Sequence, residues 1–156
     1  MSSVKSLRRP WDSSCRDSLA RLVEDFDHPV EAFGDHRLSK LGDALLNLIY
    51  SLSLSVHGGV PEGKKIPNSV LAKALESSSH KSIVPKRSDR HRKGDLVEAI
   101  FAFAWLKGLF EIRSAAQFLA DRHQAAGGAL DIEVYSVALS ELMDRMLSEM
   151  GIPEDE

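Results

Sequence analysis

The sequence predicts an all-α fold, a compact helical bundle of about five to seven helices. Apolar residues recur at spacings of three and four along several long segments, as they do on the buried face of a helix. No segment shows the period-two alternation of a half-buried strand, and most segments end at glycine or before proline. A chain of 156 residues suits one domain, so we expect a single domain over residues 1–156, with the first ten and last five residues flexible.

Two segments should form the centre of this bundle. Residues 35–56 have leucines at a helical spacing and further apolar residues around most of the circumference, so we expect the other helices to enclose this one. The leucines are Leu38, Leu41, Leu45, Leu48 and Leu52. Residues 95–107 are apolar on nearly every side, follow Gly94 and end at Gly108, which predicts a second buried helix packed on the first.

Four further helices complete the predicted bundle. The first covers residues 13–26, is capped by Asp12 or Ser13 and ends before Pro29. The others cover residues 68–76, 112–126 and 131–150, and the last two of these end at glycines.

Composition excludes several classes of protein. Cys15 is the single cysteine, so neither an intramolecular disulfide nor a four-cysteine zinc site can form. No stretch reaches the roughly 18 apolar residues that would span a bilayer. The first residues also lack the apolar core of a signal peptide. We therefore expect a cytoplasmic protein that has no membrane partner.

Charge is unevenly distributed, although the formal net charge is only −3. Residues 81–93 contain six basic residues and one acid, whereas residues 131–156 contain eight acids and one base. Such asymmetry is typical either of a solvated loop and tail or of a protein with one anion-attracting face. On the second interpretation, the basic loop would bind phosphates through Lys86, Arg87, Arg90, Arg92 and Lys93.

Three acids are candidates for chemistry. Asp43, Asp95 and Glu98 are the acids of the two central segments apart from Asp35, the first residue of its segment. Asp95 and Glu98 share a helix face because they are three residues apart, so all three carboxylates converge if the helices cross here. Bringing them together costs desolvation and mutual repulsion, both of which a divalent cation removes. Mg²⁺ prefers oxygen ligands and would activate a water for attack on a phosphodiester.

The Asp95–Glu98 pair and Asp43 each also have a purely structural interpretation. Asp95 and Glu98 fit a capping box, in which Asp95 caps the helix and Glu98 bonds back to its amide. Asp43 lies a turn or more inside its helix and is therefore no cap. Its alternative is a buried salt bridge with Lys73 or Arg37.

The order and spacing of these acids resemble the catalytic domain of the ribonuclease III family. That family has a signature ending in leucine-glycine-aspartate, here Leu41-Gly42-Asp43, which Arg37-Leu38 precedes. A later aspartate-x-x-glutamate-alanine string opens an apolar helix, here Asp95 to Ala99, and residues 66–74 look like the family's intervening helix. The resemblance implies an endoribonuclease that acts on double-stranded RNA with Mg²⁺ or Mn²⁺. It also implies that Asp43, Asp95 and Glu98 are the catalytic metal ligands.

The chain departs from the family signature at three positions. Ser39 and His36 occupy places where the signature has glutamates, and Lys40 one where it has an apolar residue that plugs into the dimer partner. The short Mini-ribonuclease III branch, which has no double-stranded-RNA-binding domain, also departs from the full signature and is closer to this chain in length. Enzymes of the family are homodimers, so the resemblance implies a homodimer.

We therefore expect a magnesium-dependent endoribonuclease that acts on double-stranded or hairpin RNA in RNA maturation. One alternative is a catalytically weakened relative that only binds RNA or a ribonucleoprotein, which Ser39 would explain. Another is an all-α nucleotide pyrophosphohydrolase, although this chain has one acidic pair where such enzymes have two. Four histidines have no metal-site spacing, and we expect them at the surface or in loops. They are His36, His57, His80 and His91.

Overall fold

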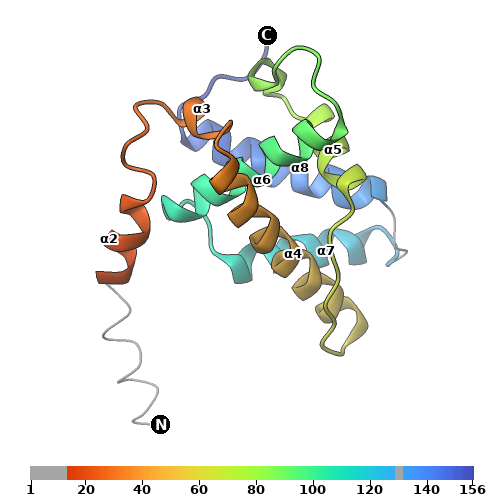
Figure 1. Cartoon of the computed structure of the whole chain (residues 1–156). Coiled ribbons are helices and arrows are strands. Elements are labelled where there is room, and N and C mark those ends of the chain that lie inside the picture. Colours follow the sequence, from red (N-terminus) through yellow and green to blue (C-terminus); the bar gives the residue numbers. More distant parts are fainter. Residues whose placement is uncertain (1–13, 129–131) are drawn as a thin grey trace.

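The computed structural model describes residues 14–128 and 132–156, and in this part of the chain it contains helices and no strands. The all-α prediction is therefore confirmed (Figure 1). The elements are α2 (Ser14–Arg21), α3 (Pro29–Ala32), α4 (His36–Gly58), α5 (Asn68–Glu76), the 3-10 turn η1 (Lys81–Ile83), α6 (Arg90–Leu106), α7 (Ile112–Ala125) and α8 (Ile132–Glu149). None of the helices in these two ranges is long and apolar enough to cross a membrane.

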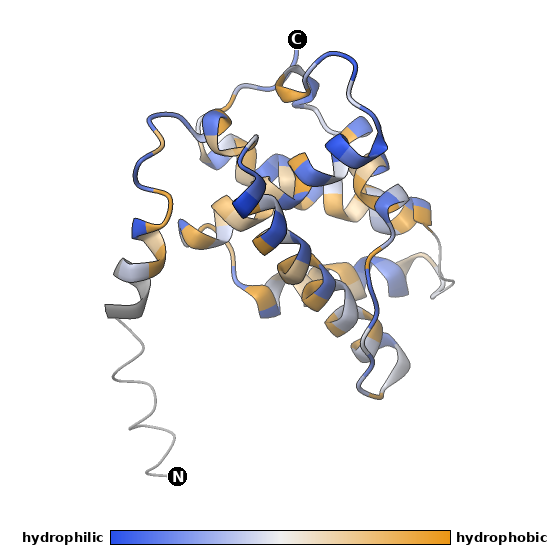
Figure 2. Cartoon of the chain, viewed as in Figure 1, coloured by the Kyte–Doolittle hydropathy of each residue, from blue (hydrophilic) through white to orange (hydrophobic). Residues whose placement is uncertain are grey.

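Helix α6 forms the centre of the bundle. It packs mainly against α4 and α5, and it also touches α2, α3 and α8. Nearly every residue between Leu96 and Leu106 is buried. Figure 1 shows α4 crossing α6, and Figure 2 shows hydrophobic residues concentrated along α6 and on the helix faces turned toward it. The prediction that the two central helices pack on each other is confirmed.

Helix α4, in contrast, is not enclosed by the other helices. Leu38 and Leu45 are buried, but Leu41, Leu48 and Leu52 are 39%, 47% and 36% exposed. The cause is that α4 packs against α6 on one side and α7 on another. This leaves one apolar stripe of α4 uncovered by any described helix, so the prediction of an enclosed helix is wrong.

Side-chain caps decide where two of the helices begin. The Asp35 carboxylate accepts hydrogen bonds from the backbone N–H groups of Arg37 (2.8 Å) and Leu38 (3.3 Å), which starts α4 as expected. The Asp89 carboxylate accepts from the backbone N–H of Arg92 (2.9 Å), so α6 starts at Arg90, five residues before the predicted start. The proposed caps of the first helix lie outside the described residues.

The four histidines lie at the surface or in a loop, as predicted, but the loop histidine, His80, is also buried. His80 is 0% exposed, and its Nδ1 lies 3.0 Å from Asp144 Oδ1 of α8. The end of the chain joins the same region, because the Asp155 carboxylate accepts from the backbone N–H groups of Lys81 and Ser82. These contacts tie the segment before the basic loop to α8 and to the C-terminal residues.

Candidate active site

A close crossing of α4 and α6 brings the candidate acids together. A Cβ atom added at Gly42 would overlap the backbone of Glu98, so the two helices touch here without a side chain between them. Only glycine permits such an approach. Asp43 follows Gly42 directly, and its position in the chain therefore places it beside Glu98.

Asp43 is half-buried and has one neutral partner. Its Oδ1 accepts a hydrogen bond from the Asn47 side-chain amide at 3.3 Å. The salt bridges that served as its alternative do not form, since Arg37 pairs with Asp35 (3.0 Å) and Lys73 with Glu133 (3.7 Å). Asp43 thus has no salt-bridge partner in the described part of the chain.

Glu98 is buried and held in an unfavourable electrostatic environment. Its residue is 7% exposed. Burial, together with the neighbouring charges of Asp43 and Asp95, raises the pKa of the Glu98 carboxyl from about 4.5 to about 7. The Ser39 hydroxyl donates a hydrogen bond to Glu98, and this bond and the charge of Lys65 act in the opposite direction. Asp43 and Asp95 therefore both lie within electrostatic reach of the Glu98 carboxyl.

Asp95 is exposed and does not cap α6. The helix begins at Arg90 with Asp89 as its N-cap, which places Asp95 in the second turn. The capping-box interpretation of Asp95 and Glu98 is therefore wrong, and a different reason is needed for two acids on this face. Their position beside Asp43 supplies one.

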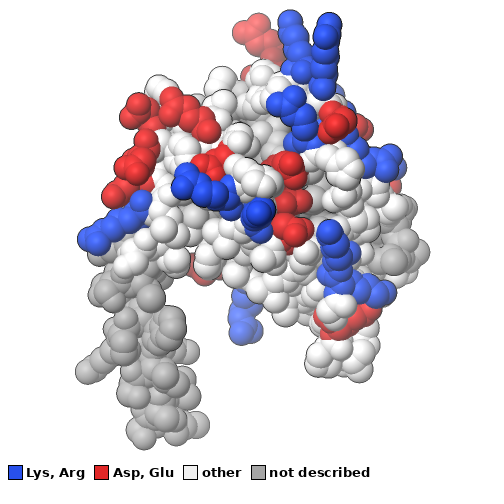
Figure 3. All heavy atoms as spheres, viewed as in Figure 1, with Lys and Arg blue, Asp and Glu red and all other residues white. Residues whose placement is uncertain are grey.

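A hollow of about 320 Å³ lies between the start of α4 and the start of α6, and Asp95 lines it whereas Asp43 and Glu98 do not. Its walls include Asp35, His36, Ser39, Arg92 and Asp95. The two positions at which the chain lacks the signature glutamates thus face the same space as Asp95. Figure 3 shows acidic side chains near the middle of this face, with basic side chains around them.

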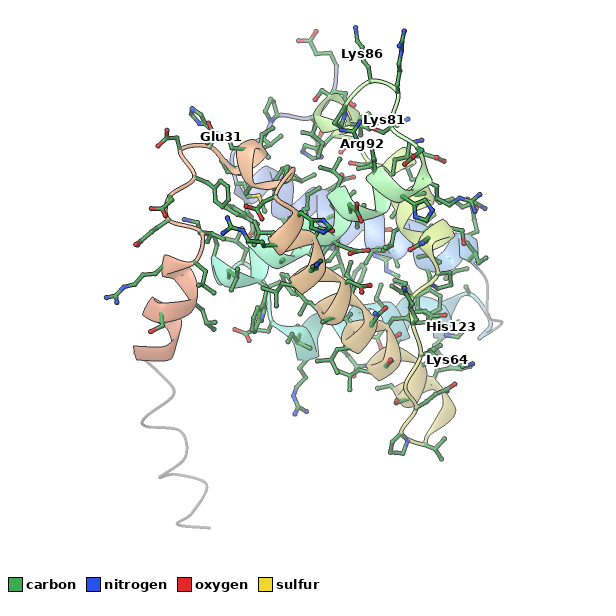
Figure 4. All side chains as sticks on the ribbon, in the orientation of Figure 1. Glu31, Lys64, Lys81, Lys86, Arg92 and His123 are labelled. Carbon is green, nitrogen blue, oxygen red and sulfur yellow. The ribbon has the colours of Figure 1, made fainter. Side chains whose placement is uncertain are left out.

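The five basic residues divide between a loop and a helix. Lys86 and Arg87 lie in the exposed loop, and Arg87 has a left-handed backbone (φ 63°). The other three lie in the first turn of α6, so the prediction of one continuous basic loop is wrong. Lys93 pairs with Glu76 at 3.1 Å. In Figure 4, Lys86 projects from the loop, and Arg92 lies nearer to the helices.

A divalent cation suits this set of donors. Among the described residues, no three His, Cys, Asp or Glu side chains are gathered into a ready-made metal cage. Asp43, Asp95 and Glu98 nevertheless offer carboxylate oxygens, which Mg²⁺ and Mn²⁺ prefer, and Mg²⁺ retains several waters, so one or two carboxylates are enough. A cation would also relieve the repulsion that raises the pKa of Glu98.

Comparison with known proteins gives the family. The family model for ribonuclease III matches residues 36–152, which include α4 to α8 and all three acids. The chain belongs to the ribonuclease III family. A comparison with curated proteins finds no significant match. Membership of the ribonuclease III family supports an endoribonuclease function with RNA as the substrate.

Sequence reasoning missed one residue near this ribonuclease III site. Lys65 acts on Glu98 although it lies in the loop between α4 and α5. The sequence shows two adjacent lysines, Lys64 and Lys65, and nothing in it distinguishes which of them faces the acids. Asn47 was recognisable, because it lies four residues after Asp43 on the same helix face.

Glu98→Gln should stabilise the metal-free protein at alkaline pH. The folded-state pKa of Glu98 is about 7, above its usual 4.5. As pH rises from about 4.5 to 7, the unfolded chain therefore loses its proton first, and the folded state loses stability. Removing the charge should recover roughly 3 kcal/mol at pH 8 and little near pH 4.5. Urea unfolding with a chelator present measures both values, and an equal gain at both would mean that glutamine acts through packing.

Proposed function

We propose that this chain is a magnesium-dependent endoribonuclease that hydrolyses phosphodiesters of double-stranded or hairpin RNA, with a role in RNA maturation. The observation that supports this most is the convergence of Asp43, Asp95 and Glu98 where α4 crosses α6, with the pKa of Glu98 raised to about 7. Acids kept together at such cost are typical of functional sites.

The three acids hold the ion, and Mn²⁺ can replace Mg²⁺ in that role. When bound, the ion supplies an activated water and neutralises charge on the leaving oxygen. Asn47 orients the Asp43 carboxylate through its amide, and Ser39 orients Glu98 through its hydroxyl. Both partners leave further carboxylate oxygens available as ligands.

The start of α6 supports binding of RNA phosphates. Arg90 and Arg92 lie in the first turn, where the helix dipole is positive, and this turn contains no acid. The Asp89 cap supplies one negative charge at this end of the helix, and a bound phosphate would supply a further partner for the two arginines. Lys86 and Arg87 extend the same basic surface. We expect contacts to phosphates rather than to bases, because double-stranded RNA is recognised mainly by shape.

Replacing Arg90 and Arg92 together by alanine should weaken duplex binding and flatten its salt dependence. Each lost phosphate contact reduces the number of counterions released, so the slope of log K against log salt should become shallower by about 1 to 2 units. Fluorescence anisotropy with a short RNA duplex at several salt concentrations measures this slope. Lys107→Ala with Arg21→Ala, near the other end of α6, is the matched control. An unchanged slope in the variant that lacks Arg90 and Arg92 would mean that these residues are solvent-exposed and do not contact RNA phosphates.

The uncovered stripe of α4 supports a homodimer, as in other enzymes of the family. Leu41, Leu48, Leu52 and Val56 are exposed on one side of this helix. The stripe continues into an apolar groove of about 740 Å³ lined by Leu52, Val56 and Ile112. An exposed apolar surface of this kind favours self-association. Lys40 is exposed and replaces the apolar plug, so the dimer would use the leucines instead. The Mini-ribonuclease III branch and a cytoplasmic location remain part of this proposal.

Cleavage of a short RNA duplex, with and without Mg²⁺, tests the proposed function. Nucleoside triphosphates incubated in parallel test the pyrophosphohydrolase alternative. Ser39→Glu restores the signature glutamate and should tighten Mg²⁺ binding. If neither the wild-type chain nor the Ser39→Glu variant cuts the duplex at about 10 mM Mg²⁺, well above the affinity range of ordinary protein sites, a relative that only binds RNA is the better description.

A further inference from the structure

The segment between α4 and α5, residues 60–67, runs back along α4 as a strap (Figure 1). Three polar side chains of α4 hold its backbone. Ser55 Oγ accepts from Glu62 N at 2.9 Å, Ser51 Oγ accepts from Lys64 N at 2.8 Å, and Asn47 Oδ1 accepts from Ile66 N at 2.9 Å. Ser51 also donates to Lys64 O at 2.9 Å.

The spacing of these contacts fixes the position of the strap along the helix. Four residues of an α-helix advance about 6 Å, and two residues of an extended chain advance about 6.6 Å. Side chains four apart on α4 therefore match every second residue of the strap. Because three such contacts occur in register, the strap cannot slide along α4 without breaking them.

This register places Lys65 next to Ile66, the strap residue that Asn47 links to Asp43. Asn47 joins the strap to the site directly, since it accepts from Ile66 N and donates to Asp43. Side chains alternate along an extended chain. Lys64, which Figure 4 labels on the strap, pairs with Glu62 at 3.0 Å. The alternation places Lys65 on the other side of the strap, and its charge acts on Glu98.

We propose that Lys65 is a further residue of the active site, a fixed cation that offsets the three carboxylates and donates a hydrogen bond to a phosphate oxygen of bound RNA. This inference rests on the proposed function. Ser39 and His36 stand where the family signature has glutamates, and Lys65 places a positive charge near the carboxylates that remain. A phosphate that meets a cation held by the acids would come close to Lys65, whose positive charge already acts on Glu98.

Lys65→Met and Lys64→Met form a matched pair of variants, because both keep an unbranched side chain of similar length and remove one charge from the same strap. Mn²⁺ binding to the RNA-free protein is the first measurement. Removing a positive charge next to the ligands should tighten Mn²⁺ binding about 3- to 10-fold in Lys65→Met. Lys64→Met should leave it unchanged, and Lys65→Arg should restore the wild-type affinity.

Single-turnover cleavage at saturating RNA and Mn²⁺ is the second measurement. Lys65→Met should cleave about 10- to 100-fold more slowly, the range expected for loss of one charged group that meets a developing charge. Tighter metal binding combined with slower cleavage is a pattern that damage to the fold would not produce. If Lys65→Met behaves as Lys64→Met in both measurements, the inference is overturned. If the wild-type chain cleaves nothing, the proposed function fails, and Mn²⁺ affinity still decides the place of Lys65. If the wild type, Lys65→Met and Lys64→Met bind Mn²⁺ equally, or if none of them binds it measurably, the assignment of Lys65 to the site is overturned.

Discussion

Asp43→Asn and Glu98→Gln are each expected to reduce cleavage of duplex RNA by roughly three orders of magnitude. Each change keeps the size and most hydrogen bonds of the side chain but removes one ligand charge. The charge of Asp43 acts on Glu98 where α4 crosses α6. The loss of either charge should therefore weaken the same cation site. Single-turnover cleavage at saturating RNA and Mg²⁺ measures the effect.

A loss of cleavage in Asp43→Asn or Glu98→Gln reports on the chemical step only if the variant still folds. Relief of repulsion should leave both variants at least as stable as the wild type in the absence of metal. Glu149→Gln on α8 removes a charge outside this site and is the matched control. Cleavage at the wild-type rate by either active-site variant would remove these carboxylates from the mechanism.

Variants of Asp95 and Asp89 separate a role in cleavage from a role in capping α6. If Asp95 were the cap, Asp95→Ala would cost about 1 kcal/mol of stability. Because the cap is Asp89, that loss should appear in Asp89→Ala instead. Thermal unfolding of the two variants distinguishes the roles, while the loss of cleavage should follow Asp95→Ala.

The helices and the three acids could be predicted from local patterns in the sequence. The segment Asn68–Glu76 was predicted with the observed bounds, because proline precedes it and polar residues follow it. Asp43 was identifiable because an aspartate between leucines inside a helix has poor propensity and needs a compensating role. The start of α6 was misplaced because Gly94 was taken as a boundary. The helix passes through Gly94, which is buried near Leu71 of α5.

Contacts between distant segments could not be predicted in this way. His80 is buried because Asp144 and Ser148, more than sixty residues later, surround its ring. The exposed leucines of α4 differ from the buried ones only in which side of the helix α6 and α7 cover. Lys65 lies near enough to act on Glu98 because of the register between the strap and α4, which depends on three hydrogen bonds and not on a local pattern.

Gly42→Ala should destabilise the protein by about 3 kcal/mol or more, although alanine is the better helix former by about 1 kcal/mol. The added methyl group would overlap backbone atoms of Glu98, and a backbone cannot move aside as a side chain can. Helices α4 and α6 would have to separate, which opens the main contact of the core. Asp43 would move away from Glu98 at the same time, so cleavage should be lost together with stability.

Gly58→Ala is the control on the same helix. Gly58 is the last residue of α4, and a Cβ atom there meets nothing within 4 Å. Alanine should therefore be neutral or stabilise the protein by about 0.5 kcal/mol through the unfolded chain. Urea unfolding of both variants gives the two free energies. We expect the free energy of unfolding to fall in Gly42→Ala and to stay equal or rise in Gly58→Ala, because only Gly42 lies against another backbone. If Gly42→Ala were as stable as the wild type, the close crossing that brings the three acids together could not be present in solution.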